Sequence, residues 1–439
     1  MQTHQDAYTM TNNILVCTVG GSHQPIVSAI RETRPDYVVF VCTDTDPASG
    51  QPGSRLQVEG AGNVIKARFQ DSAPSLPNIP AQCTLPKDRY EVITVLADVL
   101  DDVVEGIQPV LAGLRVRFPE ARLLADYTGG TKTMTAGLVM AALERDDVQL
   151  RLVTGVRNDL VRVRDGSEQS VEATAQGVRV RRAMAPYLAA WRRYGYAEAA
   201  EGFDRIALPD DERLRRTVIT GRELSRAFDA WDRFDHQKAN AILDGHRDRF
   251  DRCFPRQKAF LAVLATPDGD VSKTPARLLD LWFNAQRRAA QGRYDDAVAR
   301  AYRLLEWAAQ WLLHTHAGID TSDIAEDRVP EGLLLSVNRD GKRQAGLFAA
   351  WELVAAHVSG LPADFAARER DRLREHLTAR NFSILAHGYT PISAVAWQGF
   401  RDWIEDAFMP VLRDSFARIG VRLEPVQLPA ELPLDGDAR

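Results

Sequence analysis

The sequence predicts an α/β Rossmann-like domain with a parallel sheet at the amino end, followed by an all-α region organised as a helical bundle. Short apolar runs alternate with amphipathic segments over roughly the first 180 residues, which is the pattern of strands and helices in a parallel sheet. From about Arg181 onward the strand pattern stops, and Arg- and Ala-rich amphipathic segments replace it. The 439 residues are enough for two or three domains with substantial cores. We expect an α/β domain at 1–180, a helical connector at 181–275 and a helical bundle at 276–439.

The first part contains five apolar runs with the length of strands, and helical patterns lie between them. We expect strands at 14–19, 37–43, 91–96, 122–127 and 148–154, and helices that include 26–30, 100–118 and 137–143. Residues 47–88 are rich in Gly, Pro and Ser and are expected to be irregular, with one short helix near Val64. A hairpin that turns at Asn158 and Asp159 follows the last strand. This alternation predicts helices on both faces of the sheet.

The second part has helical patterns at 184–196, 222–234, 278–290 and 294–313. Three of these segments adjoin phrases typical of tetratricopeptide repeats, with aromatic residues at Tyr196, Phe234 and Tyr294. The spacing of these aromatics is not constant, whereas a repeat array would keep one period. We therefore interpret the phrases as helix-hairpin turns in a bundle, with a peptide-binding array as the alternative. The Pro-rich end at 424–439 is expected to be a loosely held tail.

The composition limits the classes of function. Lys and Arg number 55 against 60 Asp and Glu, giving a net charge of −5, which argues against a protein that coats nucleic acid nonspecifically but allows a local RNA cleft. The four cysteines show no metal-ligand spacing, so no metal site is expected. The amino end lacks a signal-peptide pattern, and no apolar run reaches the roughly 18 residues that span a bilayer. We expect a soluble cytoplasmic protein without a membrane partner.

Two glycine-rich loops follow expected strands, one at Gly20, Gly21, Ser22, His23 and Gln24, the other at Thr128, Gly129, Gly130, Thr131, Lys132 and Thr133. Glycines let backbone amides approach an anion, and the helix that follows adds partial positive charge at its start. The second loop fails the phosphate-binding pattern of nucleoside triphosphatases, because a Thr precedes the Lys. The first lacks the spacing of dinucleotide-binding loops. Two such loops in one domain favour a phosphate-bearing ligand, with a tight turn capped by Thr131 as the structural alternative.

A second candidate site lies near the carboxyl end, where Arg380 and Asn381 precede His387. On a regular helix Arg380 and His387 share a face, about 10 Å apart along the axis, together with His376 and Ser383. Gly388 is the expected end of that helix. A permanently charged Arg suits the phosphodiester anion, and a His near neutrality can transfer a proton. The alternative is a helix-terminal His beside a surface Arg.

These residues carry a resemblance to known families. The stretch from Arg380 to His387 resembles the Arg-Asn-(four to six)-His signature of HEPN ribonucleases. The two glycine loops resemble the ligand loops of CARF domains, which sense cyclic oligoadenylates, and this likeness covers about 12–170. The chain is therefore similar to the CRISPR-associated CARF–HEPN proteins. The resemblance makes 1–180 the CARF ligand-sensing domain and 276–439 the HEPN ribonuclease domain.

The resemblance implies an allosterically activated endoribonuclease of antiviral CRISPR defence that cleaves single-stranded RNA without a metal or other cofactor. Arg380, Asn381 and His387 would be catalytic, in a site completed by the second subunit of a homodimer, and no DNA partner is expected. Cyclic tetra-adenylate is favoured over cyclic hexa-adenylate as the activator. His376 would have a supporting role. Asp126 would brace its loop rather than contact the ligand, because its carboxylate and an anionic ligand would repel each other. Two alternatives stay open: a sensor with a catalytically silent helical module, and a ring nuclease that degrades its own activator with Ser22, Thr131 or Lys132.

Overall fold

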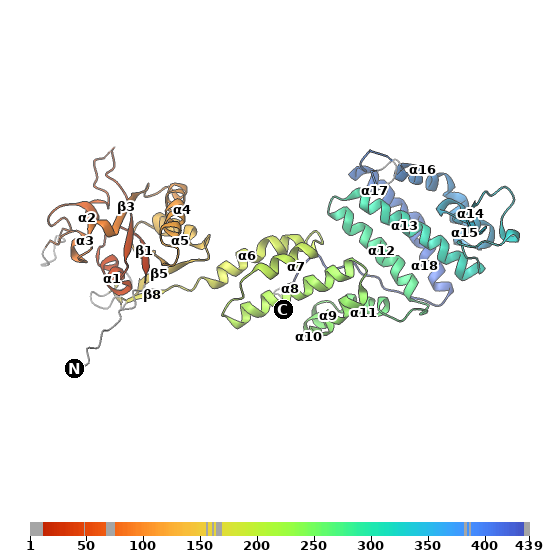
Figure 1. The fold of residues 1–439 in the computed structure, drawn as a ribbon, viewed down its shortest axis with the longest axis horizontal. Coiled ribbons are helices and arrows are strands. Elements are labelled where there is room, and N and C mark those ends of the chain that lie inside the picture. The colour runs from red at the N-terminus through yellow and green to blue at the C-terminus, as the bar shows by residue number, and fades with distance from the viewer. Residues whose placement is uncertain are drawn as a thin grey trace. The chain divides into compact units, whose positions relative to one another are not determined.

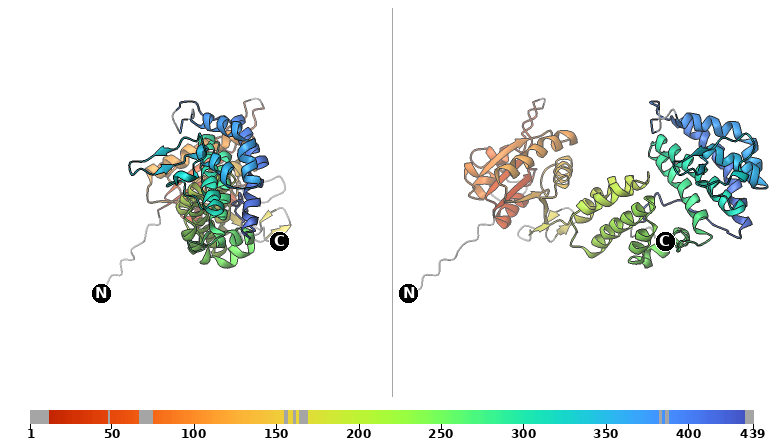
Figure 2. Two further views of the ribbon diagram at one scale, coloured as in Figure 1. Left: turned by 90° about the vertical axis from the view of Figure 1, so that its right-hand side faces the viewer. Right: turned by 45° about the vertical axis from the view of Figure 1, so that its right-hand side comes forward.

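The computed structural model describes residues 12–47, 49–66, 75–154, 157–159, 162–163, 169–381, 384–385 and 388–433. The chain divides into two compact units, Met1–Arg181 and Arg182–Arg439. Figures 1 and 2 show the course of the chain through both. No helix in the described ranges is long and apolar enough to cross a membrane.

The first unit is built on a six-stranded sheet with the order β3-β2-β1-β4-β5-β8 (Figure 1). Its strands are β1 (Asn13–Thr18), β2 (Tyr37–Cys42), β3 (Tyr90–Thr94), β4 (Arg122–Asp126), β5 (Val148–Thr154) and β8 (Gln169–Glu172). The first five are parallel to their neighbours, and β8 adds an antiparallel edge beside β5. The chain leaves β1 for β2 on one side and later enters β4 on the other. Strand order therefore reverses between β1 and β4, where sheets of this class bind ligands.

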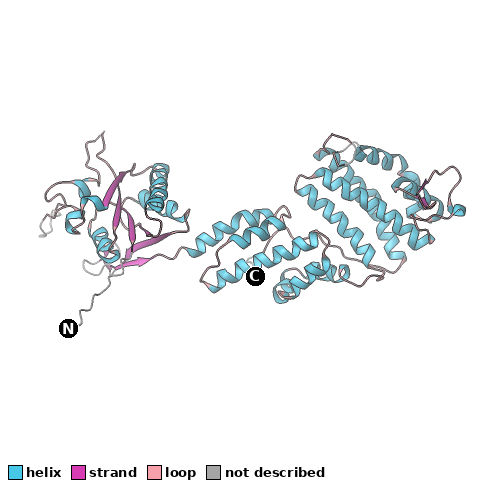
Figure 3. Cartoon of the chain, in the orientation of Figure 1, coloured by secondary structure: helices cyan, strands magenta, loops and turns pink. Residues whose placement is uncertain are grey.

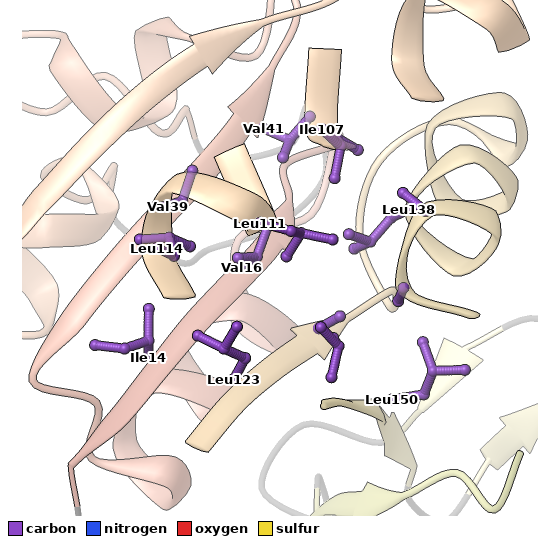
Figure 4. Close-up of a cluster of buried hydrophobic side chains, with 14 of the residues drawn as sticks. Ile14, Val16, Val39, Val41, Ile107, Leu111, Leu114, Leu123, Leu138 and Leu150 are labelled. Carbon is purple, nitrogen blue, oxygen red and sulfur yellow. The ribbon is translucent and has the colours of Figure 1, made fainter. Parts of the chain in front are cut away.

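Helices cover both faces of the sheet, because alternate residues of each strand point to opposite sides. On one face, α4 (Leu100–Arg117) and α5 (Lys132–Leu143) bury residues such as Ile107, Leu111 and Leu138 against Val16 and Val39 (Figure 4). On the other face, α1 (Gln24–Thr33) packs with the short helices α2 (Leu56–Glu59) and α3 (Ile79–Gln82). The predicted α/β class is confirmed.

Two expectations for the first unit need adjustment. The short helix predicted near Val64 is wrong, because the short helices of this region are α2 and α3, and Ile65 instead forms an isolated bridge with Leu76. The predicted hairpin is present as β6 (Arg157–Asp159) and β7 (Arg162–Val163). Asn158 and Asp159, where the turn was expected, belong to strand β6.

The second unit is helical, as predicted (Figure 3). Its principal helices are α6 (Gln176–Trp191, which contains the division between the units), α7 (Tyr196–Arg205), α8 (Glu212–Asp232), α9 (His236–Asp244), α10 (Arg247–Cys253), α11 (Pro255–Leu264), α12 (Lys273–Ala290), α13 (Tyr294–Leu312), α14 (Leu347–His357), α15 (Leu361–Arg368), α16 (Arg370–Asn381), α17 (Ala394–Trp403) and α18 (Met409–Arg418). A small antiparallel hairpin of β9 (Ser336–Val337) and β10 (Arg343–Gln344) interrupts them, which the sequence did not predict.

Three helix pairs are joined by the same kind of turn. At the ends of α6, α8 and α12, one residue adopts a left-handed conformation: Tyr194 (φ 58°), Phe234 (φ 64°) and Gly292 (φ +73°). The next amide then bonds a carbonyl five residues back, as in Asp235 N to Ala230 O at 2.9 Å. This is the Schellman arrangement that ends a helix. The interpretation of the aromatic phrases as helix-hairpin turns is confirmed.

A buried polar cluster joins α8 to α12 and to the end of the chain. The Arg287 side chain is fully buried and donates to Asp232 at 2.6 Å and to Gln427 at 2.7 Å. Tyr196 donates from its hydroxyl to the Pro429 carbonyl at 2.6 Å, and Leu428 is buried. The expectation of a loose tail is therefore wrong for 424–433, because this stretch satisfies buried donors of the helices. Residues 434–439 lie outside the described residues.

Candidate functional site

The two glycine loops meet at the carboxyl ends of β1 and β4. A Cβ atom on Gly20 would lie 2.5 Å from the backbone nitrogen of Gly130, and one on Gly129 would lie 2.3 Å from the Thr18 carbonyl oxygen. Contacts this short admit no side chain, so the loops touch backbone to backbone. Gly130 also has φ +87°, a left-handed conformation that favours glycine. The structure thus brings both predicted loops to the point where strand order reverses.

Threonine hydroxyl groups hold the second glycine loop in place through hydrogen bonds to backbone atoms. The Gly129 carbonyl accepts hydrogen bonds from Thr18 Oγ1 at 2.5 Å and from Thr135 Oγ1 at 3.0 Å. Thr131 donates to the Ala97 carbonyl at 2.7 Å and accepts from the Met134 amide at 3.2 Å, so it caps α5. Thr18 and Thr135 were not predicted, and their only signal in the sequence is a hydroxyl next to each glycine run.

Asp126 ends β4 beneath this loop and is 2% exposed. Its Oδ1 atom accepts from the Thr128 amide at 3.0 Å, so the carboxylate braces the turn. Its Oδ2 atom is buried without a partner among the described residues. Burial raises the pKa of Asp126 above its ordinary value, because a charged carboxylate loses its hydration there. A bracing role rather than a ligand-binding one fits this geometry.

The predicted ligand residues divide into buried and accessible groups. His23 is buried at the start of α1, and the Thr128 hydroxyl accepts from the Val153 amide at 2.6 Å. Four others, Gly21, Ser22, Gln24 and Lys132, are exposed, and Thr133 is half-buried. A Cβ atom on Gly21 would meet nothing within 4 Å. Neither packing nor a positive φ therefore requires glycine at position 21, whereas a ligand that approaches the backbone would.

A third loop, which the sequence did not single out, adjoins the first. Gln57 of α2 donates from Nε2 to the Gly20 carbonyl at 2.6 Å. The chain between β2 and α2 surrounds a cavity of about 200 Å³ lined by Asp44, Thr45, Gly53, Arg55, Leu56 and Glu59. The guanidinium of Arg55 pairs there with Asp44 at 3.1 Å and with Glu59 at 2.5 Å. Gln57 therefore connects the segment that lines this cavity to the first glycine loop.

The second candidate site lies at the end of α16. Arg380 and Asn381 are the last two residues of this helix, and the structure does not describe their side chains. Ser383 and His387 lie outside the described residues. The predicted helix that continues to Gly388 is wrong, because α16 ends at Asn381 and the next described residues, Ile384 and Leu385, form a turn. The axial separation of about 10 Å for a continuous helix thus does not apply.

His376, expected on the same helix face as Arg380, packs against aromatic rings of α17. Its ring lies 4.6 Å from the ring centre of Phe400 and 4.7 Å from that of Trp403. Burial among these rings lowers its pKa below the ordinary value, which favours the neutral imidazole. His376 therefore packs α16 onto α17.

Comparison with known proteins decides the class of the helical part. Residues 269–409 match the family model of the Csm6 HEPN domain. This part of the chain is similar to the Csm6 HEPN domain. It begins just before α12 and contains Arg380, Asn381 and His387, so the predicted HEPN assignment is confirmed.

The fold of the whole chain agrees with this assignment. Enterococcus italicus Csm6 bound to cyclic hexa-2′-fluoro-hexa-dAMP superimposes with a TM-score of 0.55 at 13% identity, over 93% of this chain and 95% of that one. Can2 from Sulfobacillus thermosulfidooxidans in complex with cyclic tetra-adenylate matches 57% of this chain and 68% of its own at 15% identity, with a TM-score of 0.22. No curated protein matches the sequence significantly. The chain has the CARF–HEPN fold, with the sheet unit as the CARF domain.

Proposed function

We propose that this protein is an endoribonuclease whose HEPN domain cleaves single-stranded RNA when a cyclic oligoadenylate binds its CARF domain. The observation that carries the proposal is the coincidence of the Arg-Asn…His motif with the family match at 269–409. The HEPN family to which this domain belongs is a ribonuclease family, and its match contains all three proposed catalytic residues.

The CARF domain supplies the features that an anionic cyclic nucleotide needs. The backbone at Gly21 is open to close approach, and the ammonium group of Lys132 has no hydrogen bond or ion pair with any described residue. Lys132 also begins α5, so its charge adds to the positive end of that helix. The phosphates would lie over these loops, and Asp126 stays beneath them as a brace. The solved Csm6 relative contains a cyclic hexanucleotide analogue, which supports this class of ligand.

In the HEPN domain, Arg380 would hold the scissile phosphate and stabilise the charge that develops in the transition state. A ribose 2′-hydroxyl would attack the adjacent phosphorus, forming a 2′,3′-cyclic phosphate and breaking the bond to the 5′-oxygen. The 2′-hydroxyl proton is lost and the leaving 5′-oxygen gains one; His387 would take part in this proton transfer, and Asn381 would orient these groups. This reaction requires no metal. Each chain carries one such set, so we propose a homodimer in which two sets form a composite site. A symmetric cyclic ligand also suits a two-fold dimer, because both subunits present the same surface to it.

Single-turnover cleavage of a labelled RNA tests the proposal, with cyclic tri-, tetra- or hexa-adenylate and with EDTA present. Arg380→Ala and His387→Ala should lower the activated rate by about 100-fold or more, since proton transfer alone is worth about 10²–10⁴. Arg372→Ala is the matched control, because Arg372 lies exposed on the same helix. Wild-type cleavage by either Arg380→Ala or His387→Ala would remove the mechanism.

The two alternatives predict other outcomes in the same experiment. A silent sensor binds the cyclic ligand but never cleaves RNA. A ring nuclease linearises the ligand, which chromatography of the ligand after incubation detects, with Lys132→Ala as a control. The hydroxyl of Thr131 is already committed to Ala97 and Met134, which argues against Thr131 as the group that attacks the ligand.

A further inference from the structure

A carboxylate at the start of α13 fixes the chain that follows the HEPN motif. Asp295 is the second residue of this helix, and its Oδ2 atom accepts a hydrogen bond from the Ile392 amide at 3.1 Å. The two residues are 97 positions apart in the chain. Ile392 comes five residues after His387 and directly before Ser393, the residue that caps α17. Asp295 therefore holds the carboxyl end of the connection between α16 and α17.

The next residue strengthens the same attachment. Ser393 caps α17 by accepting from the Ala396 amide at 3.1 Å. At the other end of the connection, α16 is held by the buried side chain of Leu373 and the packed ring of His376. Asp295 and the Ser393 cap thus hold the described residues that lead into α17, on the side that follows His387 in the sequence.

Only one of the two carboxylate oxygens of Asp295 takes part in this hydrogen bond. Its Oδ1 atom is buried and has no partner among the residues that the structure describes. A buried carboxylate oxygen of this kind costs free energy, and an apolar residue at the same place would avoid that cost. Position 295 also lies in the first turn of α13, where the helix dipole favours an acid. Asp296 lies in the same turn and would interact with the helix dipole equally well, but it pairs with Arg300 at 3.0 Å. The helix dipole alone therefore does not account for the bond between Asp295 and Ile392.

We propose that Asp295 is a positioning residue of the HEPN site, which holds the Gly388–Ile392 segment in register with the end of α16. The proposal rests on the nuclease function given above. Catalytic geometry is sensitive to small displacements, since a misplacement of about 1 Å can cost about 100-fold in rate. Release of Ile392 from α13 would free the segment that follows His387 and would leave the CARF domain unchanged.

Three variants separate this role from general stability. Asp295→Ala removes the acceptor, Asp295→Asn keeps a carbonyl oxygen for the Ile392 amide, and Asp296→Ala removes a neighbouring acid of the same helix turn. We expect the activated kcat of Asp295→Ala to fall about tenfold or more, with KM for RNA and affinity for cyclic oligoadenylate within about threefold of wild type. Asp295→Asn and Asp296→Ala should both stay within about threefold in kcat. Equal rates for Asp295→Ala and Asp296→Ala, or an Asp295→Asn variant as slow as Asp295→Ala, would overturn the proposal.

Hydrogen exchange gives a readout that does not depend on nuclease activity. The Ile392 amide should exchange about tenfold faster or more in Asp295→Ala than in wild type, and at the wild-type rate in Asp296→Ala. Unchanged exchange in Asp295→Ala would refute the anchor itself. A wild-type protein that never cleaves RNA would instead refute the proposed function, and the exchange measurement would still decide whether Asp295 holds this segment.

Discussion

The contact between the two glycine loops makes a quantitative prediction for Gly20→Ala. The new methyl group would lie 2.5 Å from the nitrogen and 2.9 Å from the Cα of Gly130. Both atoms belong to the backbone, so no side chain can rotate out of the way. Overpacking of this kind costs about 1–3 kcal/mol. The loss of glycine entropy in the unfolded chain offsets about 0.4–1 kcal/mol, which leaves a net destabilisation centred on about 1.3 kcal/mol and at most about 2.6 kcal/mol.

Gly21→Ala is the matched control, because a Cβ there meets nothing within 4 Å and its φ is not positive. It should leave stability unchanged or raise it by up to about 1 kcal/mol. Under the proposed function it should nevertheless weaken cyclic oligoadenylate binding, since the methyl group occupies the space above the backbone. The two substitutions therefore separate loop packing from ligand approach.

Scanning calorimetry of the full chain measures the effect. For a unit of this size, a loss of 1 kcal/mol lowers Tm by about 2–4 °C. All 8 tryptophans follow Arg181, so tryptophan fluorescence reports on the second unit and serves as an internal control. We expect Gly20→Ala to lower the transition of the first unit while the fluorescence transition stays in place. A Gly20→Ala protein as stable as Gly21→Ala would refute the backbone contact between the loops.

Three further predictions concern other parts of the molecule. Lys132→Ala, at an exposed position, should leave the free energy of unfolding within about 0.5 kcal/mol of wild type. It should weaken cyclic tetra-adenylate binding roughly tenfold, or about 1.4 kcal/mol, in titration calorimetry, and unchanged affinity would contradict the role of Lys132 in binding. Arg287→Met should lower the free energy of unfolding by about 3–5 kcal/mol in urea titrations, because it leaves Asp232 and Asp280 buried with fewer partners, whereas the exposed control Arg303→Gln should change little. The pKa of His376 is lowered in the folded protein, so this side chain binds a proton less readily there than in the unfolded chain, and the stability of the protein should fall as pH drops below about 6.5. His376→Phe should flatten that part of the pH–stability curve, and an unchanged slope would show that His376 does not cause the fall.

Much of the fold could be predicted because it follows from local patterns. Apolar runs of strand length, such as the one that became β2, and the 3.6-residue period of α4 and α13 lie in contiguous sequence. The left-handed turns at Tyr194, Phe234 and Gly292 were found through the aromatic phrases beside them. The confirmed HEPN assignment likewise rested on a contiguous motif.

What the sequence did not predict depends on residues far apart in the chain. The hydrogen bonds of Gln57 to Gly20 and of Asp295 to Ile392 join segments with no shared pattern, so no periodicity reveals them. The order in the 424–433 segment was missed because its prolines and acids resemble a tail, while its carbonyls are used by Tyr196 and Gln257. One exception is local: Gly388 is the nearest helix-stop residue in the sequence, so the turn at Ile384 and Leu385 was not predicted.

The most direct test of the central claim is the single-turnover rate of RNA cleavage as a function of cyclic tetra-adenylate concentration, for wild type and Lys132→Ala. If ligand binding at the glycine loops drives cleavage by the HEPN domain, the wild-type rate rises from near zero to a plateau. The Lys132→Ala curve then reaches the same plateau at about tenfold higher ligand. Cleavage that is independent of any cyclic oligoadenylate, or identical curves for the two proteins, would contradict the claim.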